Sequence, residues 1–217
     1  MLHLVSGGNG VGKTLNVLKW VRERQVKEGR PVAYNGRFDP VPDGELKDWK
    51  KIDIKDWQDE PDGTIFVVDE AHNDFPVRPS GQAAPNYIAM IAEHRKRGFD
   101  FYFITQHPNN IDAFIRRLIS APGWHRHIKR NGGGTLVSVL EWTAVNGTCE
   151  KQGSAKTADV KMVAFPKEVY GWYTSAVLHT SSRRIPKKLV NMLFCALVAP
   201  VLGYFAYSKA MGNYSPK

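Results

Sequence analysis

Short and almost continuous apolar runs, separated by polar connections, recur along the first half of the chain. The runs cover residues 2–5, 32–34, 65–68 and 101–104. A strand that is buried on both faces gives such a run, because helices cover both faces of a parallel sheet. The pattern therefore predicts an α/β protein with a doubly wound, mostly parallel sheet.

Segments with helical periodicity lie between these runs. Residues 14–28 place apolar side chains on one side of a helix, and the Gly and Pro at positions 29 and 31 end the pattern. Further helices are predicted over residues 86–96 and 110–118, and a last strand over residues 160–165. The alternation of strands and helices supports the α/β prediction.

Two strand-like segments later in the chain predict a β-hairpin. Residues 124–130 and 135–142 flank the turn-forming run Gly132–Gly134. His125 and His127 alternate along the first segment and therefore share one face of it. Zinc would need further ligands, and the sequence places none convincingly. The alternative is a basic β-ribbon that contacts DNA or another partner.

Near the C-terminus, residues 189–207 carry no charge over 19 positions, close to the roughly 20 with which a helix crosses a bilayer. Arg183, Arg184, Lys187 and Lys188 precede this segment, and basic flanks stay on the cytoplasmic side. The alternative is a buried or amphipathic helix, but no polar face is present. The predicted organisation is a cytoplasmic domain over 1–180, a basic linker over 181–188, a single transmembrane helix over 189–207 and a short periplasmic tail over 208–217.

The net charge of +9 is concentrated at the C-terminal end. Residues 171–217 contain six Lys and Arg and no Asp or Glu, which leaves +3 on residues 1–170. Bulk charge therefore does not by itself predict a nucleic-acid-binding domain. Cys149 and Cys195 are too few for a disulfide framework, which indicates a reducing compartment.

The candidate chemistry begins at the glycine-rich segment after the first apolar run. Its sequence matches the G-x-x-x-x-G-K-[ST] phosphate loop between a strand and a helix. Backbone N–H groups and the positive end of the helix would face phosphate, Lys13 would reach the β- and γ-phosphates of ATP, and the Thr14 hydroxyl would ligate Mg²⁺. A glycine-rich turn that matches by chance is the alternative. The predicted nucleotide-binding residues are Gly7, Gly8, Asn9, Gly10, Val11, Gly12, Lys13 and Thr14.

Polar side chains follow two of the predicted central strands. Asp69 would hold Mg²⁺, directly or through water, and Glu70 would orient and polarise the attacking water. Gln106 follows the run at 101–104. If that strand lies between the phosphate-loop strand and the Asp69 strand, Gln106 would face the γ-phosphate and sense its presence. The alternative for Gln106 is an ordinary polar residue at the end of a strand.

Arg116 and Arg117 lie on the predicted helix over residues 110–118. Ring ATPases commonly offer an arginine to the γ-phosphate of a neighbouring subunit, and Arg117 is the candidate here. Because such an arginine needs a neighbour, a homo-oligomeric ring is expected. A plain surface arginine is the alternative.

Together these motifs resemble the zonula occludens toxin (Zot) family, whose other members are the inner-membrane assembly ATPases of filamentous phages. The resemblance covers nearly the whole chain in order. The parts most specific to this family are the block from Arg95 to Leu118 and the block from Tyr173 to Thr180, because many unrelated proteins share the phosphate loop. It rests on residues 7–14, 67–71 (VVDEA), 94–100 (HRKRGFD), 104–108 (ITQHP), 111–112 (ID), 115–118 (IRRL), 173–176 (YTSA) and 179–180 (HT).

The resemblance implies a cytosolic P-loop ATPase domain akin to DNA-pumping ATPases, one transmembrane helix and a periplasmic segment. The implied activity is ATP hydrolysis that drives phage assembly and export of single-stranded DNA at the bacterial host's inner membrane. Phage coat and assembly proteins and an outer-membrane exit channel are the implied partners.

Two alternatives stay open. The first is a membrane-anchored effector, toxin-like, or a scaffold protein, which binds nucleotide without turnover. The second is a nucleotide kinase, against which the predicted span and the adjacent Asp-Glu pair both argue. The sequence does not decide between ATP and GTP.

Overall fold

The computed structural model describes residues 1–130, 136–175, 192, 198–200, 203–204 and 207–209. The chain divides into two compact units, Met1–Thr180 and Ser181–Lys217. The predicted linker over 181–188 and most of the predicted transmembrane segment over 189–207 lie outside the described residues. Within the described residues, no helix is both long enough and apolar enough to cross a membrane.

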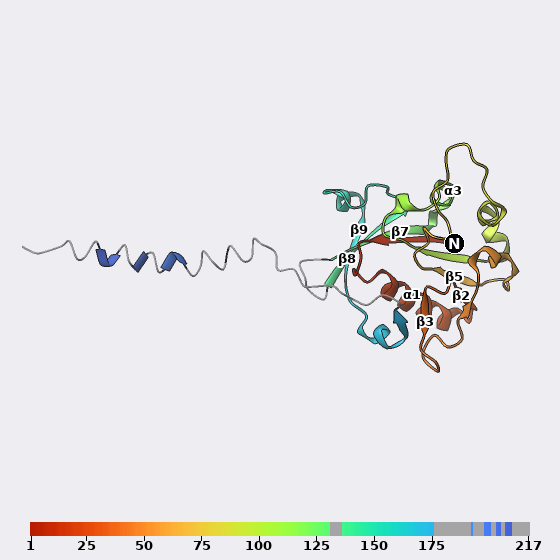
Figure 1. Ribbon diagram of the computed structural model, residues 1–217, viewed down its shortest axis with the longest axis horizontal. Coiled ribbons are helices and arrows are strands. Elements are labelled where there is room, and N and C mark those ends of the chain that lie inside the picture. Colours follow the sequence, from red (N-terminus) through yellow and green to blue (C-terminus); the bar gives the residue numbers. More distant parts are fainter. Residues whose placement is uncertain (131–135, 176–191, 193–197, 201–202, 205–206, 210–217) are drawn as a thin grey trace, which may run out of the picture. The chain divides into compact units, whose positions relative to one another are not determined.

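An eight-stranded sheet forms the centre of the first unit, in the order β4-β2-β5-β6-β1-β7-β8-β9 (Figure 1). The strands from β4 to β7 in this order run parallel, whereas β8 pairs antiparallel with β7 and β9 pairs antiparallel with β8. The prediction of a mostly parallel α/β sheet is therefore confirmed. The strands are β1 (Leu2–Gly7), β2 (Val32–Tyr34), β4 (Lys50–Lys51), β5 (Ile65–Val68), β6 (Asp100–Ile104), β7 (Ser120–Arg130), β8 (Leu136–Ala144) and β9 (Asp159–Ala164).

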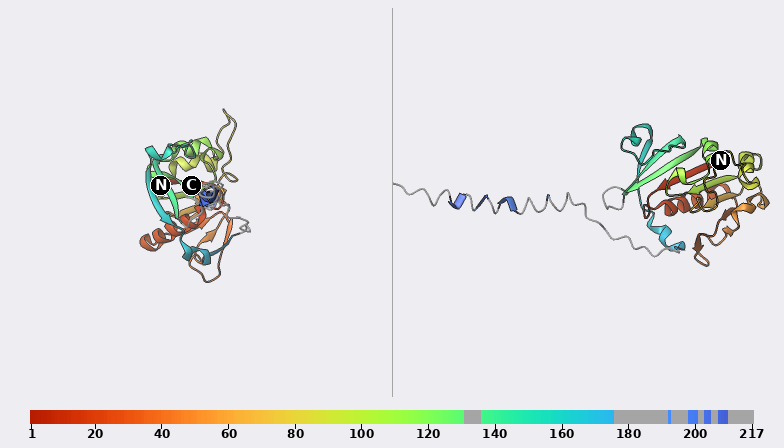
Figure 2. Two further views of the ribbon diagram at one scale, coloured as in Figure 1. Left: turned by 90° about the vertical axis from the view of Figure 1, so that its left-hand side faces the viewer. Right: turned by 45° about the horizontal axis from the view of Figure 1, so that its top comes forward.

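The central strands are apolar on both faces because each face packs against its own core. On one face, Val5 is fully buried in a cluster with the apolar side of α1 (Lys13–Glu28). On the other face, Phe66 is fully buried in a cluster that includes residues of η2 (Met90–Arg97) and α3 (Ala113–Leu118). Figures 1 and 2 show helices on both sides of the sheet. This burial on both faces is the physical origin of the continuous apolar runs.

The helices agree with the predicted positions, except that α3 begins at Ala113, after the cap Asp112, and not at residue 110, and that one helix differs in type. α1 ends at Gly29, whose φ of 65° places it in the left-handed region and lets its N–H bond the Gln25 carbonyl oxygen. The segment predicted as a helix over 86–96 is one turn of α-helix, α2 (Asn86–Ala89), followed by the 3₁₀-helix η2. The spacing of apolar residues fits both helix types, so the pattern could not distinguish them.

The predicted hairpin is confirmed, because β7 and β8 pair antiparallel with Ile128 opposite Val139. Its expected turn, Gly132–Gly134, lies outside the described residues. The predicted last strand corresponds to β9, which pairs antiparallel with β8.

The segment after β9 returns to the first part of the chain, which the sequence did not predict. In η5 (Lys167–Gly171), Val169 is fully buried in the same core as α1. β10 (Tyr173–Ser175) then pairs antiparallel with β3 (Phe38–Pro40) in a separate two-stranded sheet. The pairing joins segments that are distant in sequence, and a three-residue strand gives too short a pattern to detect.

Candidate nucleotide-binding site

The glycine-rich segment connects the end of β1 to the start of α1. Gly7 lies so close to β7 that a Cβ at this position would come within 2.5 Å of the Ile128 carbonyl oxygen. Gly12 has a φ of 85°, and a Cβ there would overlap the ring of Phe165. Close packing against two neighbouring segments therefore requires glycine at both ends of the loop.

The last two residues of the loop carry its functional side chains. Lys13 Nζ donates a hydrogen bond to the Gly8 carbonyl oxygen (3.0 Å), so the ammonium group lies over the loop. Burial lowers the pKa of Lys13, against the opposing pull of Glu70 and Asp69. Thr14 Oγ1 donates to Asp69 Oδ2 (3.1 Å). The fold thus brings the phosphate loop against the carboxylate that follows β5.

Asp69 is held in a buried position at the end of β5. Asn35 fixes its backbone from both sides: Asn35 Oδ1 accepts from the Asp69 N–H (3.1 Å), and Asn35 Nδ2 donates to the Asp69 carbonyl oxygen (2.7 Å). Burial, together with the negative charge of Glu70, raises the pKa of Asp69 to about 6. An ionised carboxylate in this position is therefore stabilised by a nearby cation.

The oxygen donors beside the loop fit the predicted magnesium ligands. The Thr14 hydroxyl and the Asp69 carboxylate are hard donors of the kind that Mg²⁺ prefers, and they are in direct contact. Mg²⁺ commonly takes few protein ligands and completes its shell with water and phosphate oxygens, so two residues are sufficient.

Glu70 has a strained backbone and an unsatisfied side chain. Its φ of 46° lies in the left-handed region, which non-glycine residues rarely adopt. Its Oε2 atom lies 3.3 Å from His72 Nδ1, but the alignment is not that of a hydrogen bond, and no other described residue satisfies this buried oxygen. Strain and an unsatisfied oxygen at the end of a strand are typical of a side chain that serves chemistry.

Gln106 lies at the end of β6, and β6 lies between β1 and β5, the arrangement that its predicted role required. Its carbonyl oxygen accepts from the Gly7 N–H (3.0 Å), so its backbone contacts the start of the phosphate loop. The side chain is exposed at this edge of the sheet. The backbone of Gln106 therefore adjoins the start of the phosphate loop.

The two arginines of α3 do not join this group. Arg116 Nη1 donates to Asn109 Oδ1 (2.7 Å), which holds that side chain against the preceding loop. Arg117 is exposed and makes no hydrogen bond or ion pair with another described residue. Because α3 connects the end of β6 to the start of the parallel strand β7, it runs away from the edge of the sheet that carries the phosphate loop.

A second polar cluster lies between β1 and β7. Ser6 Oγ is 2.7 Å from His125 Nε2, 2.8 Å from His127 Nδ1 and 3.8 Å from Cys149 Sγ. The two histidines share a strand face, as predicted. Cys149 adds a third possible ligand that the sequence could not place, and the three ligand atoms lie within 4.8 Å of one another.

The direction of the hydrogen bonds argues against zinc in this cluster. His125 Nδ1 accepts from the Asn146 N–H (3.1 Å), so the hydrogen of the neutral ring is on Nε2, the atom that faces Ser6. A metal-bound histidine has the reverse arrangement, in which the second nitrogen donates. Burial lowers the pKa of His125 to about 3 and that of His127 to about 4, which keeps both rings neutral. We interpret the cluster as a buried hydrogen-bond network that fixes the end of β1.

Sequence reasoning did not identify Asn35 and His72 as parts of the site. Asn35 directly follows the strand over 32–34, so the rule that found Asp69 and Gln106 could also have found it: a polar residue at the carboxyl end of a buried strand. His72 carries no such signal, because it lies beyond the turn that Glu70 makes.

Comparisons with known proteins agree with this fold. Residues 1–180 match the family model described as zonular occludens toxin (Zot). The protein described as "Putative assembly protein ORF301" of Pseudomonas phage Pf3 is 33% identical over 215 residues, which cover 97% of this chain and 70% of that protein.

Two solved structures extend the comparison. The N-terminal domain of zonular occludens toxin from Neisseria meningitidis matches with a TM-score of 0.65 and 26% identity, over 80% of this chain and 98% of that domain. B204, the DNA-packaging ATPase from Sulfolobus turreted icosahedral virus, matches with a TM-score of 0.50 and 9% identity, over 74% of this chain and 95% of its own. The second likeness shows the fold alone.

Proposed function

Since the chain belongs to the zonular occludens toxin (Zot) family, we propose that it is a membrane-anchored, Mg²⁺-dependent ATPase that drives filamentous phage assembly and export of single-stranded DNA through the inner membrane of the bacterial host. The assembly role is supported by the relative from phage Pf3, which is described as an assembly protein. The membrane anchor is supported by the uncharged segment over 189–207 and its basic flank.

One observation carries the proposed ATPase activity. Thr14 of the phosphate loop donates directly to Asp69 (3.1 Å), which supports one site shared by the loop and the acidic pair after β5. In our proposal, Lys13 and the backbone N–H groups of the loop bind the β- and γ-phosphates, and Glu70 orients the attacking water. Mg²⁺, held by Thr14 and Asp69, supplies positive charge at the phosphate oxygens.

Two further residues complete the proposed mechanism. Gln106, at the edge between the loop and Asp69, contacts the γ-phosphate and responds to its presence. Arg117 is exposed on α3, the helix that runs away from the loop edge of the sheet, which supports a role on the nucleotide of a neighbouring subunit. The proposed active form is therefore a homo-oligomeric ring, and full activity of a strict monomer would contradict this part.

The test is ATP hydrolysis by the full chain reconstituted in lipid bilayers, with and without single-stranded DNA. We expect turnover that DNA stimulates and that both Lys13→Ala and Glu70→Gln abolish, with Glu70→Gln still binding ATP. Glu93→Gln and Lys96→Ala are matched controls, because these residues pair with each other on an exposed surface (2.9 Å) away from the loop. Both controls should retain wild-type turnover.

The opposite result is equally informative. ATP binding without turnover, unchanged by DNA or by Glu70→Gln, would contradict the proposed ATPase and favour an anchored nucleotide-binding protein. Transfer of phosphate to a nucleoside monophosphate would favour a kinase instead.

Anchoring is tested on its own with Leu197→Arg and Val201→Arg in the full chain. Each arginine near the middle of a spanning helix costs about 3 kcal/mol of insertion free energy. We expect the unaltered chain to stay in the membrane fraction after alkaline extraction and the double variant to be released. Retention of both in the pellet would contradict a membrane-spanning segment.

A further inference from the structure

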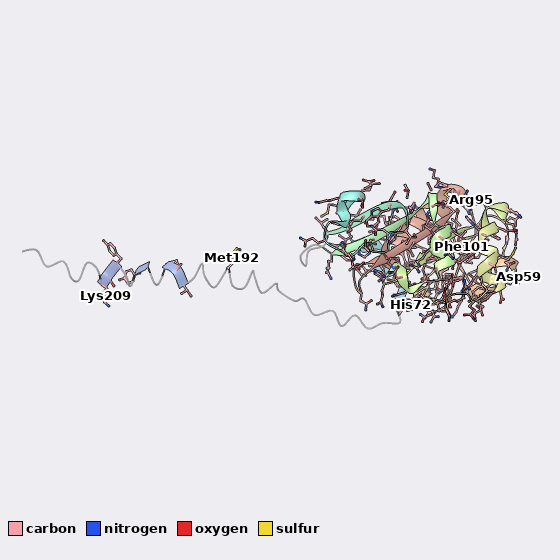
Figure 3. All side chains as sticks on the ribbon, turned by 90° about the horizontal axis from the view of Figure 1, so that it is seen from above. Asp59, His72, Arg95, Phe101, Met192 and Lys209 are labelled. Atoms are coloured by element: carbon pink, nitrogen blue, oxygen red, sulfur yellow. The ribbon has the colours of Figure 1, made fainter. Side chains whose placement is uncertain are left out.

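The carboxylate of Glu70 lies beside a polar neighbour that no sequence motif indicates. Its side chain projects from a left-handed turn, and Oε2 has no aligned hydrogen-bond partner among the described residues. The nearest polar atom is His72 Nδ1, at 3.3 Å. The imidazole of His72 is 31% exposed, and Figure 3 shows His72 at the periphery of the domain, whereas Phe101 lies in its interior.

His72 also contacts the end of β6. Its Nδ1 lies 3.5 Å from Thr105 Oγ1, so one ring nitrogen stands between the Glu70 carboxylate and the Thr105 hydroxyl. Because a carboxylate only accepts hydrogen bonds, a ring that serves it carries the hydrogen on Nδ1. Both oxygens lie within 3.5 Å of this nitrogen, so they compete for the same N–H.

Thr105 in turn connects to the phosphate loop. It is fully buried, and its N–H donates to the Val5 carbonyl oxygen (3.0 Å). The next residue is Gln106, whose carbonyl oxygen accepts from the Gly7 N–H (3.0 Å). A displacement at the end of β6 would therefore reach the His72 ring through one buried hydroxyl group.

We propose that His72 is a positioning residue that holds the Glu70 carboxylate toward the attacking water and couples its orientation to Thr105. The proposal rests on the proposed function, because it assigns a task within ATP hydrolysis. His72 acts through Glu70 and has no contact of its own with Lys13 or Thr14 of the loop. Its loss therefore slows hydrolysis and leaves nucleotide binding intact.

The kinetic test uses His72→Ala, His72→Asn and Thr105→Val in the full chain. We expect His72→Ala to lower kcat about tenfold, while KM and the Kd of a non-hydrolysable ATP analogue stay within about twofold. His72→Asn keeps an N–H near the position of Nδ1 and restores most of kcat. Thr105→Val lowers kcat less, and adding it to His72→Ala causes no further loss, because both act on one contact.

His107→Asn is the matched control. Like His72, His107 is a partly exposed histidine paired with a carboxylate, Glu150 (2.8 Å), but this pair does not touch Glu70. Asparagine can still accept the hydrogen bond that His107 Nδ1 receives from the Asn109 N–H. We expect wild-type kcat for this variant.

A second measurement does not require turnover. The ring-nitrogen NMR signals of His72 report its hydrogen bonds directly. We expect Glu70→Gln and Thr105→Val each to shift these signals, and a non-hydrolysable ATP analogue to shift them in the wild-type chain but not in Thr105→Val.

The outcomes separate this proposal from the proposed function. Wild-type kcat in His72→Ala, or parallel losses of kcat and analogue affinity, would overturn the positioning role and leave the ATPase proposal standing. No hydrolysis by the wild-type chain would overturn the ATPase proposal and, with it, the catalytic task of His72. The NMR signals would still test the contact between His72 and Glu70. Ring-nitrogen signals of His72 that do not change in Glu70→Gln would refute this contact.

Discussion

At the scale of single residues, the ring of Phe165 determines how the phosphate loop tolerates substitution. Gly12 and Gly10 both have positive φ, 85° and 70°, so alanine at either position strains the backbone by about 1 kcal/mol. At Gly12 the added methyl group would also overlap the Phe165 ring, whereas Gly10 has open space. We expect Gly12→Ala to lower the free energy of unfolding by about 1–3 kcal/mol more than Gly10→Ala. Urea unfolding of both variants measures the difference.

The same comparison in a Phe165→Ala background is the control. Without the ring, the two glycine variants retain only the backbone strain that they share, so their free energies of unfolding should change equally. Equal changes in the presence of Phe165 would mean that the ring moves aside without cost.

The residue scale also shows where sequence reasoning ends. Lys13, Thr14 and Asp69 follow buried strands or stand in a contiguous motif, and the structure brings them together. The contact between Glu70 and His72 depends instead on a left-handed φ at a glutamate. A non-glycine residue in that conformation has no sequence signature, so the histidine beyond the turn could not be predicted.

At the scale of elements, Asp112 fixes the start of α3. It is 1% exposed, its Oδ1 accepts from the Phe114 N–H (2.7 Å), and both its carboxylate oxygens accept from Arg78. Asp112→Asn keeps an acceptor for the cap but removes the ion pair, whereas Asp112→Ala removes both. We therefore expect the alanine variant to lose more stability than the asparagine variant, by about the 1 kcal/mol of an N-cap. Urea unfolding measures both variants.

Asp53 is the control for this prediction. It caps the 3₁₀-helix η1 (Ile54–Asp59) by accepting from the Lys55 N–H (3.0 Å), but it is exposed. Water can replace the lost acceptor there, so Asp53→Ala should cost less than Asp112→Ala. The reverse order would contradict the role of burial at the α3 cap.

Elements were predictable where a long pattern specified them. The buried strands β1, β5 and β6 contain almost continuous apolar runs, and their predicted positions are confirmed. The pairing of β10 with β3 was not predictable, because each strand has only three residues and the partners are distant in sequence. Such a contact depends on where η5 places the chain, which only the folded core determines.

At the scale of the whole domain, buried histidines make stability depend on pH, and His3, His125 and His127 are those whose pKa falls furthest. His3 is 2% exposed, and neither of its ring nitrogens has a hydrogen-bond partner in the described part of the chain. Burial lowers the pKa of His3 and His125 to about 3 and that of His127 to about 4. An unfolded histidine titrates near pH 6.5, so between about pH 6.5 and 4 these residues bind more protons in the unfolded chain.

The free energy of unfolding should therefore fall as pH falls through this window, and these histidines add no further dependence above it. Each histidine contributes a slope of about 1.4 kcal/mol per pH unit. Asp69 offsets the slope of about one histidine. Its pKa is raised to about 6 in the folded state, so below that pH the folded chain binds a proton at Asp69 that the unfolded chain does not bind. From these four groups we expect a net loss of about 3 kcal/mol per unit between about pH 6 and 5, measured by urea unfolding at constant ionic strength.

His3→Phe isolates the cause of this dependence. The His3 ring lies 4.6 Å from the Tyr102 ring and 4.3 Å from the Trp124 ring, centroid to centroid, so phenylalanine preserves an aromatic side chain in that position. The substitution removes one titrating group and two unpaired ring nitrogens. The slope should therefore decrease by about 1.4 kcal/mol per pH unit. An unchanged pH slope of the unfolding free energy in His3→Phe would mean that His3 binds a proton as readily in the folded chain as in the unfolded chain. That result would contradict the proposal that burial keeps the folded His3 ring neutral.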